Sequence, residues 1–343
     1  MKTSEFDFQL DESLIAQHPT DKRPNSRLLV VHKNSGELEH KHFYDIIDYL
    51  HEGDVLVRNN TRVIPARLFG TKEITNAHVE VLLLKEIKKD TWECLVGNAR
   101  VVKIDTIISF NDGVLRAKCI KIGEKGIRHF EMIYEGIFFE VISDLGNIPL
   151  PPYIHEKPED PERYQTVYSK IKGSAAAPTA GLHFTDEIFS QLANKGVTVV
   201  DVTLHVGLGT FRPMDTENIE EHIMHSEFYQ MSKETADILN KAKSENRRII
   251  TVGTTSTRTL ESVYQKYNTF KECSEETDIF IFPGYKFKAV DSIITNFHLP
   301  KSTLIMMISA FATKDLIFKA YSEAIERKYR FFSFGDSMLI TNE

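Results

Sequence analysis

The spacing of hydrophobic residues changes along the chain, and the first stretch mixes strand and helix patterns. Arg27–Val31 is a short apolar run typical of a buried strand. Within His42–Leu50, apolar residues recur at positions i, i+3, i+4 and i+7, which predicts an amphipathic helix. Val55–Val57 then predicts a second strand. The N-terminal stretch therefore begins an α/β unit.

The middle stretch consists of short β-rich segments with turn residues between them and no helical spacing. Several strands at this spacing favour an antiparallel barrel or sandwich. A helix, 137–145, and a proline-rich segment, 146–154, follow them. The expected strands are 62–69, 78–84, 91–96, 106–110, 114–122 and 127–133.

Beyond the prolines, strand and helix patterns alternate, which predicts a largely parallel α/β sheet. The expected strands are 197–204, 248–252, 279–282, 292–294 and 337–340, and the expected helices are 186–195, 233–245, 257–267, 302–311 and 314–328. We therefore predict a three-layer α/β main domain made from residues 1–61 and 152–343, with residues 62–151 inserted as an antiparallel β domain.

Composition narrows the possible partners. The chain has 42 basic and 49 acidic residues, a net charge of −7, so any contact with RNA requires a local basic patch. Three cysteines without a CxxC pair argue against a disulfide framework and a cysteine zinc site. The start lacks a secretory pattern, and the most apolar run, 303–312, is shorter than a membrane span. We expect a cytoplasmic protein with no membrane contact.

A strand that runs into Gly253 and then into a helix is the clearest binding signal. Thr254, Thr255, Ser256 and Thr257 follow the glycine. Such a junction directs free backbone N–H groups at an anion or nucleotide, but the hydroxyls could equally cap the helix. No lysine follows at the position that a P-loop requires.

Two further segments combine small residues with rings. Gly207 and Gly209 follow a strand but lack the third glycine of a dinucleotide fingerprint, so they suggest only that a flat ligand approaches the backbone. Residues 173–185 are mostly small and include His183 and Phe184, which could supply a proton carrier and a stacking face. A tight connection beneath another element would explain the small residues equally well.

Four of thirteen histidines, His183, His205, His225 and His298, lie near expected strand ends or loops. No HxH or HExxH spacing supports a metal site, and no GxSxG elbow supports a serine hydrolase. We therefore predict no metal.

Basic and polar residues crowd the entrance to the β insert. In an acidic chain they are candidates for RNA phosphate contacts, although a solvated, salt-bridged face is the alternative. The residues are Arg58, Asn59, Asn60, Thr61, Arg62 and Arg67.

Taken together, these segments resemble the S-adenosylmethionine:tRNA ribosyltransferase-isomerase family of the queuosine pathway. The matching strings run in the family's order and are 59–70 (NNTRVIPARLFG), 149–154 (PLPPYI), 164–168 (YQTVY), 176–184 (AAPTAGLHF), 203–211 (TLHVGLGTF), 222–227 (HIMHSE), 252–256 (VGTTS), 295–300 (TNFHLP), 302–305 (STLI) and 328–336 (KYRFFSFGD).

The resemblance implies an inserted β-barrel and a defined reaction. The ribosyl part of S-adenosylmethionine moves onto 7-aminomethyl-7-deazaguanine at the tRNA wobble position, giving epoxyqueuosine-tRNA, adenine and methionine. The partners implied are S-adenosylmethionine and the tRNA anticodon region, with no cofactor; we expect a monomer. An S-adenosylmethionine-dependent RNA methyltransferase, a non-catalytic RNA-binding module and a metal-dependent hydrolase are the alternatives.

Roles within these motifs are hypotheses. His183 and His205 are the first acid–base candidates, with His298 and His225 next. Asn296 would orient a histidine or bind adenine, and Arg258 would face the methionyl carboxylate. The remaining expected substrate-binding residues are Thr179, Gly181, Phe184, Gly207, Gly209, Thr210, Phe211, Gly253, Thr254, Thr255 and Ser256.

Overall fold

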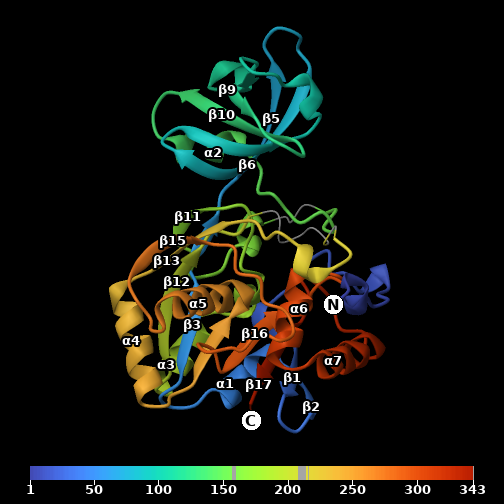
Figure 1. Ribbon diagram of the computed structural model, residues 1–343, viewed down its shortest axis with the longest axis vertical. Coiled ribbons are helices and arrows are strands. Elements are labelled where there is room, and N and C mark those ends of the chain that lie inside the picture. The colour runs from blue at the N-terminus through green and yellow to red at the C-terminus, as the bar shows by residue number, and fades with distance from the viewer. Residues whose placement is uncertain (157–159, 208–213, 215, 343) are drawn as a thin grey trace. The chain divides into compact units, whose positions relative to one another are not determined.

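The computed structural model describes residues 1–156, 160–207, 214 and 216–342, and the chain divides into two compact units (Figure 1). The main unit contains residues 1–61, 151–171 and 177 onward. The barrel unit contains residues 62–150 and 172–176.

The described residues of the main unit form a nine-stranded sheet, in the order β15-β13-β12-β3-β14-β16-β17-β1-β2. Half of its eight pairings are parallel and half antiparallel, so the expectation of a largely parallel sheet is wrong and the sheet is mixed. The strands are β1 (Arg27–His32), β2 (Leu38–His42), β3 (Val55–Asn59), β12 (Thr198–Leu204), β13 (Glu227–Met231), β14 (Ile249–Val252), β15 (Cys273–Thr277), β16 (Ser292–Asn296) and β17 (Ser337–Thr341).

Helices cover both faces of this sheet, which confirms the three-layer main domain. Ile250 and Val252 of β14 point into a core shared with Phe184 and Leu192, on the face of α1 and α3. Successive strand residues point to opposite faces, so Thr251 points the other way. Its hydroxyl meets that of Thr257, on α5, at 2.7 Å.

Side-chain caps explain where several helices begin. Thr185, Ser232, Ser302 and Thr313 each accept a backbone N–H from the first turn of α3, α4, α6 and α7, which satisfies an otherwise unpaired donor. The helices are α1 (Ile46–Tyr49), α2 (Phe138–Leu145), α3 (Asp186–Asn194), α4 (Lys233–Ser244), α5 (Gly253–Tyr267), α6 (Thr303–Phe311) and α7 (Lys314–Glu326).

The barrel unit is a closed six-stranded antiparallel barrel, which confirms the inserted β-barrel. Its interior is filled by alternating residues such as Leu83, Cys94 and Phe130, all buried. The barrel strands are β5 (Arg67–Lys72), β6 (His78–Lys88), β7 (Thr91–Val96), β8 (Ile107–Phe110), β9 (Leu115–Ile122) and β10 (Ile127–Tyr134). A separate two-stranded sheet pairs β4 (Thr61–Val63) with β11 (Ile171–Ser174).

Three expected elements are wrong in detail. Residues 279–282 form no strand; the strand of this region is β15, which ends at Thr277. The expected helix 42–50 is a 3₁₀ turn, Phe43–Asp45, followed by the single turn of α1. The expected helix 257–267 begins four residues earlier, because Gly253 adopts a φ of +87° and turns the chain directly from β14 into α5.

Candidate functional site

The parallel geometry of four neighbouring strands gathers the sequence motifs at one edge of the sheet. β12, β3, β14 and β16 run parallel, so their carboxyl ends lie at the same edge. The segments that follow these ends are 205–207, 60–61, 253–255 and 297–299. Ligands of open α/β sheets bind at such edges.

A small cleft of about 50 Å³, which continues into open solvent, lies in the main unit, where β14 and β16 end. Among the described residues, no Asp, Glu, Lys or Arg lines it, so the cleft is uncharged apart from any protonated histidine. Its lining is mostly apolar, with a few hydroxyls, one amide and one imidazole. The lining residues are Tyr153, Ala177, Pro178, Thr179, Ala180, Val206, Gly253, Thr254, Thr255, Thr295, Asn296, Phe297, His298, Leu299, Leu304, Phe332 and Ser333.

The hydroxyls that follow Gly253 do not cap α5. Ser256 donates to the carbonyl oxygen of Val252 and Thr257 to that of Gly253, so both are used inside the helix. Helix-capping by Thr255, Ser256 or Thr257 is therefore wrong. Thr254 and Thr255 instead line the cleft, and the buried hydroxyl of Thr255 has no hydrogen-bond partner in the part of the chain that the structure describes.

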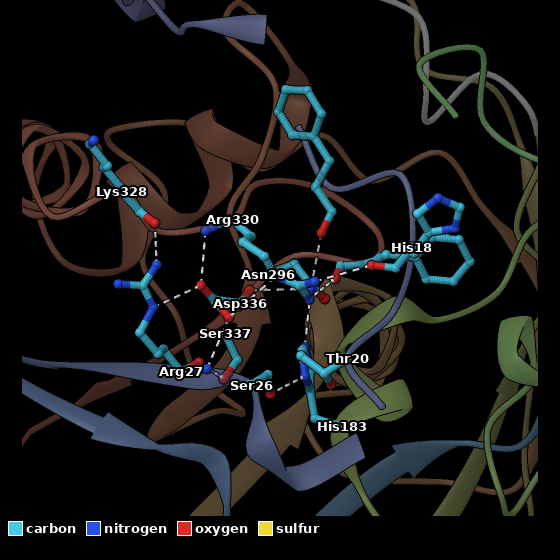
Figure 2. A network of polar contacts seen from close by, with 12 residues as sticks. His18, Thr20, Ser26, Arg27, His183, Asn296, Lys328, Arg330, Asp336 and Ser337 are labelled. Carbon is cyan, nitrogen blue, oxygen red and sulfur yellow. Dashed lines mark hydrogen bonds and ion pairs between the residues drawn. The ribbon is translucent and has the colours of Figure 1, made fainter. Parts of the chain in front are cut away.

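His183 lies behind Asn296 and is held at both ring nitrogens (Figure 2). Its Nδ1 lies 2.7 Å from the Ser26 hydroxyl, and its Nε2 lies 3.1 Å from Nδ2 of Asn296. Burial, and to a lesser degree the charges of Arg330 and Arg23, lower the pKa of His183 to about 3. His183 is therefore neutral near pH 7, and neither nitrogen is open to a substrate in this conformation.

His298 lies directly on the cleft. Its Nε2 is 2.8 Å from the hydroxyl of Thr295, and its backbone N–H donates to the hydroxyl of Tyr321. Burial lowers the pKa of His298 to about 3, so the ring is neutral near pH 7. Of the four histidine candidates, His298 is the one that reaches the cleft wall.

His205 follows β12 at the same sheet edge and packs on Phe228, with ring centroids 5.6 Å apart. Its Nδ1 lies 2.8 Å from the hydroxyl of Thr61, which itself donates to the carbonyl oxygen of Ile171 at 3.4 Å. Thr61 thus occupies the Nδ1 side of the His205 ring. Burial lowers the pKa of His205 to about 4. His225, in contrast, is exposed and does not line the cleft.

Two residues expected to touch substrate serve the packing of the protein instead. A Cβ on Gly181 would lie 2.0 Å from the hydroxyl oxygen of Tyr168, so this glycine makes room for a tyrosine. Phe184 is fully buried between Phe43 and Phe189 and presents no face to a ligand. Gly181 and Phe184 thus form a tight connection, whereas residues 177–180 of the same segment line the cleft.

Arg258 is buried on α5 and forms an ion pair with Glu227, at the start of β13. The other carboxylate oxygen of Glu227 accepts the backbone N–H of Gly207 at 3.0 Å. Through these contacts, Glu227 connects the segment that follows β12 to α5. Arg258 does not line the cleft. Gly209, Thr210 and Phe211 lie outside the described residues.

Most of the polar side chains at the end of β3 already bind other groups of the protein. Arg58 pairs with Asp201 at 2.6 Å and lies over the rings of Tyr168 and Phe189. Asn59 is fully buried, and its amide bonds to the backbone of Leu204 and Thr61.

The other members of the cluster differ in exposure. The Asn60 side chain accepts from Thr203, and Thr61 binds His205. Arg67, in the barrel unit, is half-exposed and pairs with Glu80 at 3.1 Å, and Arg62 is also half-exposed. Arg62 and Arg67 thus keep part of their side-chain surface exposed, although Arg67 also pairs with Glu80.

Sequence reasoning missed several residues of the site. Ser26, Tyr153 and Ser333 carry no motif of their own, although Tyr153 and Ser333 fall inside matched strings. Glu227 is the last residue of the matched string 222–227, but no strand was expected there and no role was assigned to it. Within the described ranges, no cluster of His, Cys, Asp or Glu could hold a metal, and no helix is long and apolar enough to span a membrane.

Comparison with known proteins gives two similarities that cover nearly the whole chain. A family described as queuosine biosynthesis protein matches residues 3–340. A crystal structure of an S-adenosylmethionine tRNA ribosyltransferase from Thermotoga maritima is 39% identical, with a TM-score of 0.57. The match covers 98% of this chain and 100% of the other.

Proposed function

The chain belongs to the queuosine biosynthesis protein family, and from this premise we propose that it is an S-adenosylmethionine:tRNA ribosyltransferase-isomerase. It moves the ribosyl part of S-adenosylmethionine onto 7-aminomethyl-7-deazaguanine in the anticodon of tRNA. The products are epoxyqueuosine-tRNA, adenine and methionine. The similarity to the Thermotoga maritima ribosyltransferase supports the donor and the RNA substrate.

The observation that carries this proposal is the uncharged cleft at the carboxyl ends of β14 and β16. It offers an amide at Asn296, an imidazole at His298 and an unpartnered hydroxyl at Thr255 among apolar walls. Such a surface suits a neutral heterocycle and a sugar, because a few polar groups fix orientation while apolar walls exclude water.

The chemistry starts from the positive sulfur of the donor. The sulfonium acidifies the adjacent C5′–H, and loss of that proton breaks the C4′–O4′ bond; the freed O4′ becomes a carbonyl at C1′ as adenine leaves and takes up a proton. The aminomethyl nitrogen of the RNA base then adds to C4′, C5′ bonds to the C1′ carbonyl carbon to close the carbocycle, and the resulting alkoxide displaces methionine from C5′ as the epoxide forms. A proton acceptor, a proton donor for adenine and a water-poor site are required.

His298 and His205 are the proton carriers of this proposal. Burial lowers the pKa of both rings, so each is neutral near pH 7 and has one unprotonated nitrogen, but the lowered pKa also makes each a weaker base. Their candidacy rests on position: His298 is on the cleft wall, and His205 follows β12 at the same sheet edge. His183, whose nitrogens are both occupied, is assigned a supporting role.

RNA binding is assigned to basic residues that keep exposed surface. The barrel unit has fourteen basic and twelve acidic residues, although the whole chain carries a charge of −7. Arg62 and Arg67 are half-exposed basic residues of this unit, and they are the phosphate contacts of the proposal.

The decisive experiment combines purified protein, S-adenosylmethionine and tRNA that already carries the aminomethyl-deazaguanine. We expect free adenine and methionine in equal amounts, and an RNA nucleoside heavier by the epoxycyclopentane unit. S-adenosylhomocysteine as the product would instead identify a methyltransferase. Binding without turnover of the donor would identify a non-catalytic RNA-binding protein.

Three further properties belong to the proposal. The enzyme needs no metal or organic cofactor, so a chelator should leave the rate of adenine release unchanged. It acts as a monomer of 39.3 kDa, which light scattering behind a sizing column measures. It works in the cytoplasm, where fractionation should find it together with tRNA.

A further inference from the structure

The carboxamide of Asn296 carries an unexplained buried atom. Asn296 is 3% exposed, lines the cleft, and its Oδ1 has no hydrogen-bond partner among the described residues. A buried acceptor without a donor is costly, typically about 1–3 kcal/mol. An acceptor in this state on a cleft wall indicates a ligand that brings the missing donor.

The orientation of this amide follows from its neighbours. Its Nδ2 lies 3.2 Å and 3.3 Å from the carbonyl oxygens of Phe332 and Asp336, which can only accept hydrogen bonds. The nitrogen must therefore face these carbonyls, and the oxygen must be the atom without a partner. An amide flip would place oxygen against two carbonyl oxygens.

His183 and Ser26 complete the arrangement from behind (Figure 2). Because the carbonyl oxygens of Phe332 and Asp336 fix Nδ2 of Asn296 as the donor, Nε2 of His183 accepts from it at 3.1 Å and is unprotonated. Nδ1 then carries the ring proton and donates at 2.7 Å to the Ser26 hydroxyl, which lies 3.3 Å from the carbonyl oxygen of Arg23. Ser26 thereby stabilises the histidine tautomer that matches this orientation of the amide.

We propose that Asn296 Oδ1 accepts a hydrogen bond from the exocyclic amine of the adenine ring of the donor, and that Ser26 and His183 are positioning residues for this contact. The inference rests on the proposed function. Adenine and the deazaguanine of the RNA both carry N–H donors. Adenine is favoured because the described lining offers no cation to accompany an RNA phosphate.

The test compares S-adenosylmethionine with its deaminated analogue, S-inosylmethionine, in which oxygen replaces the amine. Calorimetry measures the Kd of each ligand for the protein without RNA. We expect the wild-type protein to bind the analogue at least tenfold more weakly. Asn296→Ala should reduce this discrimination to about twofold or less, because the contact that reads the amine is gone.

Ser26→Ala tests the positioning role. The histidine then loses its Nδ1 acceptor, and discrimination should fall several-fold. Ser309→Ala is the matched control: Ser309 is a buried serine on α6 whose hydroxyl has no hydrogen-bond partner, and it does not line the cleft. This variant should keep the wild-type ratio. Loss of folding would weaken both ligands alike and leave the ratio unchanged, so the ratio separates the two effects.

Three outcomes would overturn the inference. Equal affinity of the wild-type protein for both ligands would show that the amine is not read. Unchanged discrimination in Asn296→Ala would assign the reading to another group. If Asn296→Ala instead weakens binding of the modified tRNA alone, Oδ1 serves the RNA base. Each result is compatible with normal adenine release by the wild-type enzyme, so the inference can fail while the proposed function stands.

Discussion

Two buried neutral histidines should make the stability of this protein strongly dependent on pH below neutrality. Burial lowers the pKa of His183 and of His298 from 6.5 to about 3 in the folded state. In the unfolded chain both rings titrate near 6.5, so the unfolded state binds more protons as the pH falls. The free energy of unfolding therefore declines as the pH falls through 6.5, and the loss continues toward pH 3.

The magnitude follows from the linkage relation. Between pH 7 and pH 5, one histidine with these two pKa values costs about 2 kcal/mol of stability, and the two together cost about 4 kcal/mol. This is a large share of a typical total of about 5–15 kcal/mol. Urea denaturation at several pH values measures it, provided that unfolding is two-state.

Variants separate this contribution from that of other groups. Between pH 7 and pH 5, the free energy of unfolding of His183→Gln and of His298→Gln should each fall by about 2 kcal/mol less than that of the wild-type protein. His155→Gln, at an exposed position, is the control and should follow the wild-type curve. A wild-type loss below about 1 kcal/mol, or a ring proton of either buried histidine titrating near pH 6.5 by NMR, would refute the reasoning.

Three other predictions follow from contacts of single residues. Arg258→Met leaves the Glu227 carboxylate buried without its partner and should lower the free energy of unfolding by about 3–5 kcal/mol, measured by urea denaturation. The double variant Arg258→Met with Glu227→Gln should recover much of this loss, and equal loss in both variants would contradict the pairing. Gly181→Ala places a Cβ 2.0 Å from the Tyr168 hydroxyl and should cost about 1–3 kcal/mol, with part recovered by Tyr168→Phe; a neutral effect would show that the packing is loose. In tRNA binding titrations, Arg62→Ala should reduce the slope of log affinity against log salt concentration by about one, and Arg58→Ala should leave this slope unchanged. The reverse pattern would exchange their roles.

The sequence predicted the strands that carry the site because those strands are buried on both faces. Residues 249–252 and 292–296 are continuous runs of buried residues, and such runs are recognisable without a structure. Because β14 and β16 are parallel, the motifs that follow them meet at one edge. The grouping of Gly253, Thr255, Asn296 and His298 was therefore within reach of pattern reasoning.

The antiparallel additions to the sheet were not predictable in the same way. β2 reads Leu-Glu-His-Lys-His, and its residues are half-buried or exposed at the sheet edge. β15 alternates weakly and carries two glutamates. Neither shows the apolar run that marks a strand, because each is stabilised by backbone pairing with a neighbour.

Roles within the site depended on contacts across long sequence separations. Asn296 lies 113 positions from His183, and its amide nitrogen determines which histidine nitrogen stays unprotonated. A histidine in a motif is equally compatible with an acid, a base or a support, and only its partners distinguish these roles. The same holds for Arg58, whose guanidinium is occupied by Asp201 and two rings.

The proposal places a positively charged donor in a cleft whose described lining carries no charged side chain, which has a consequence for specificity. With the donor in this cleft, no carboxylate among the described lining residues would neutralise the sulfonium, so the positive sulfur would keep its ability to acidify the neighbouring C–H. Recognition must then come from directional hydrogen bonds, since the walls are otherwise apolar. An amide whose orientation is fixed by Phe332, Asp336 and His183 supplies such direction without adding charge. A neutral, rigid wall thus reconciles selection of the donor with activation of its sugar.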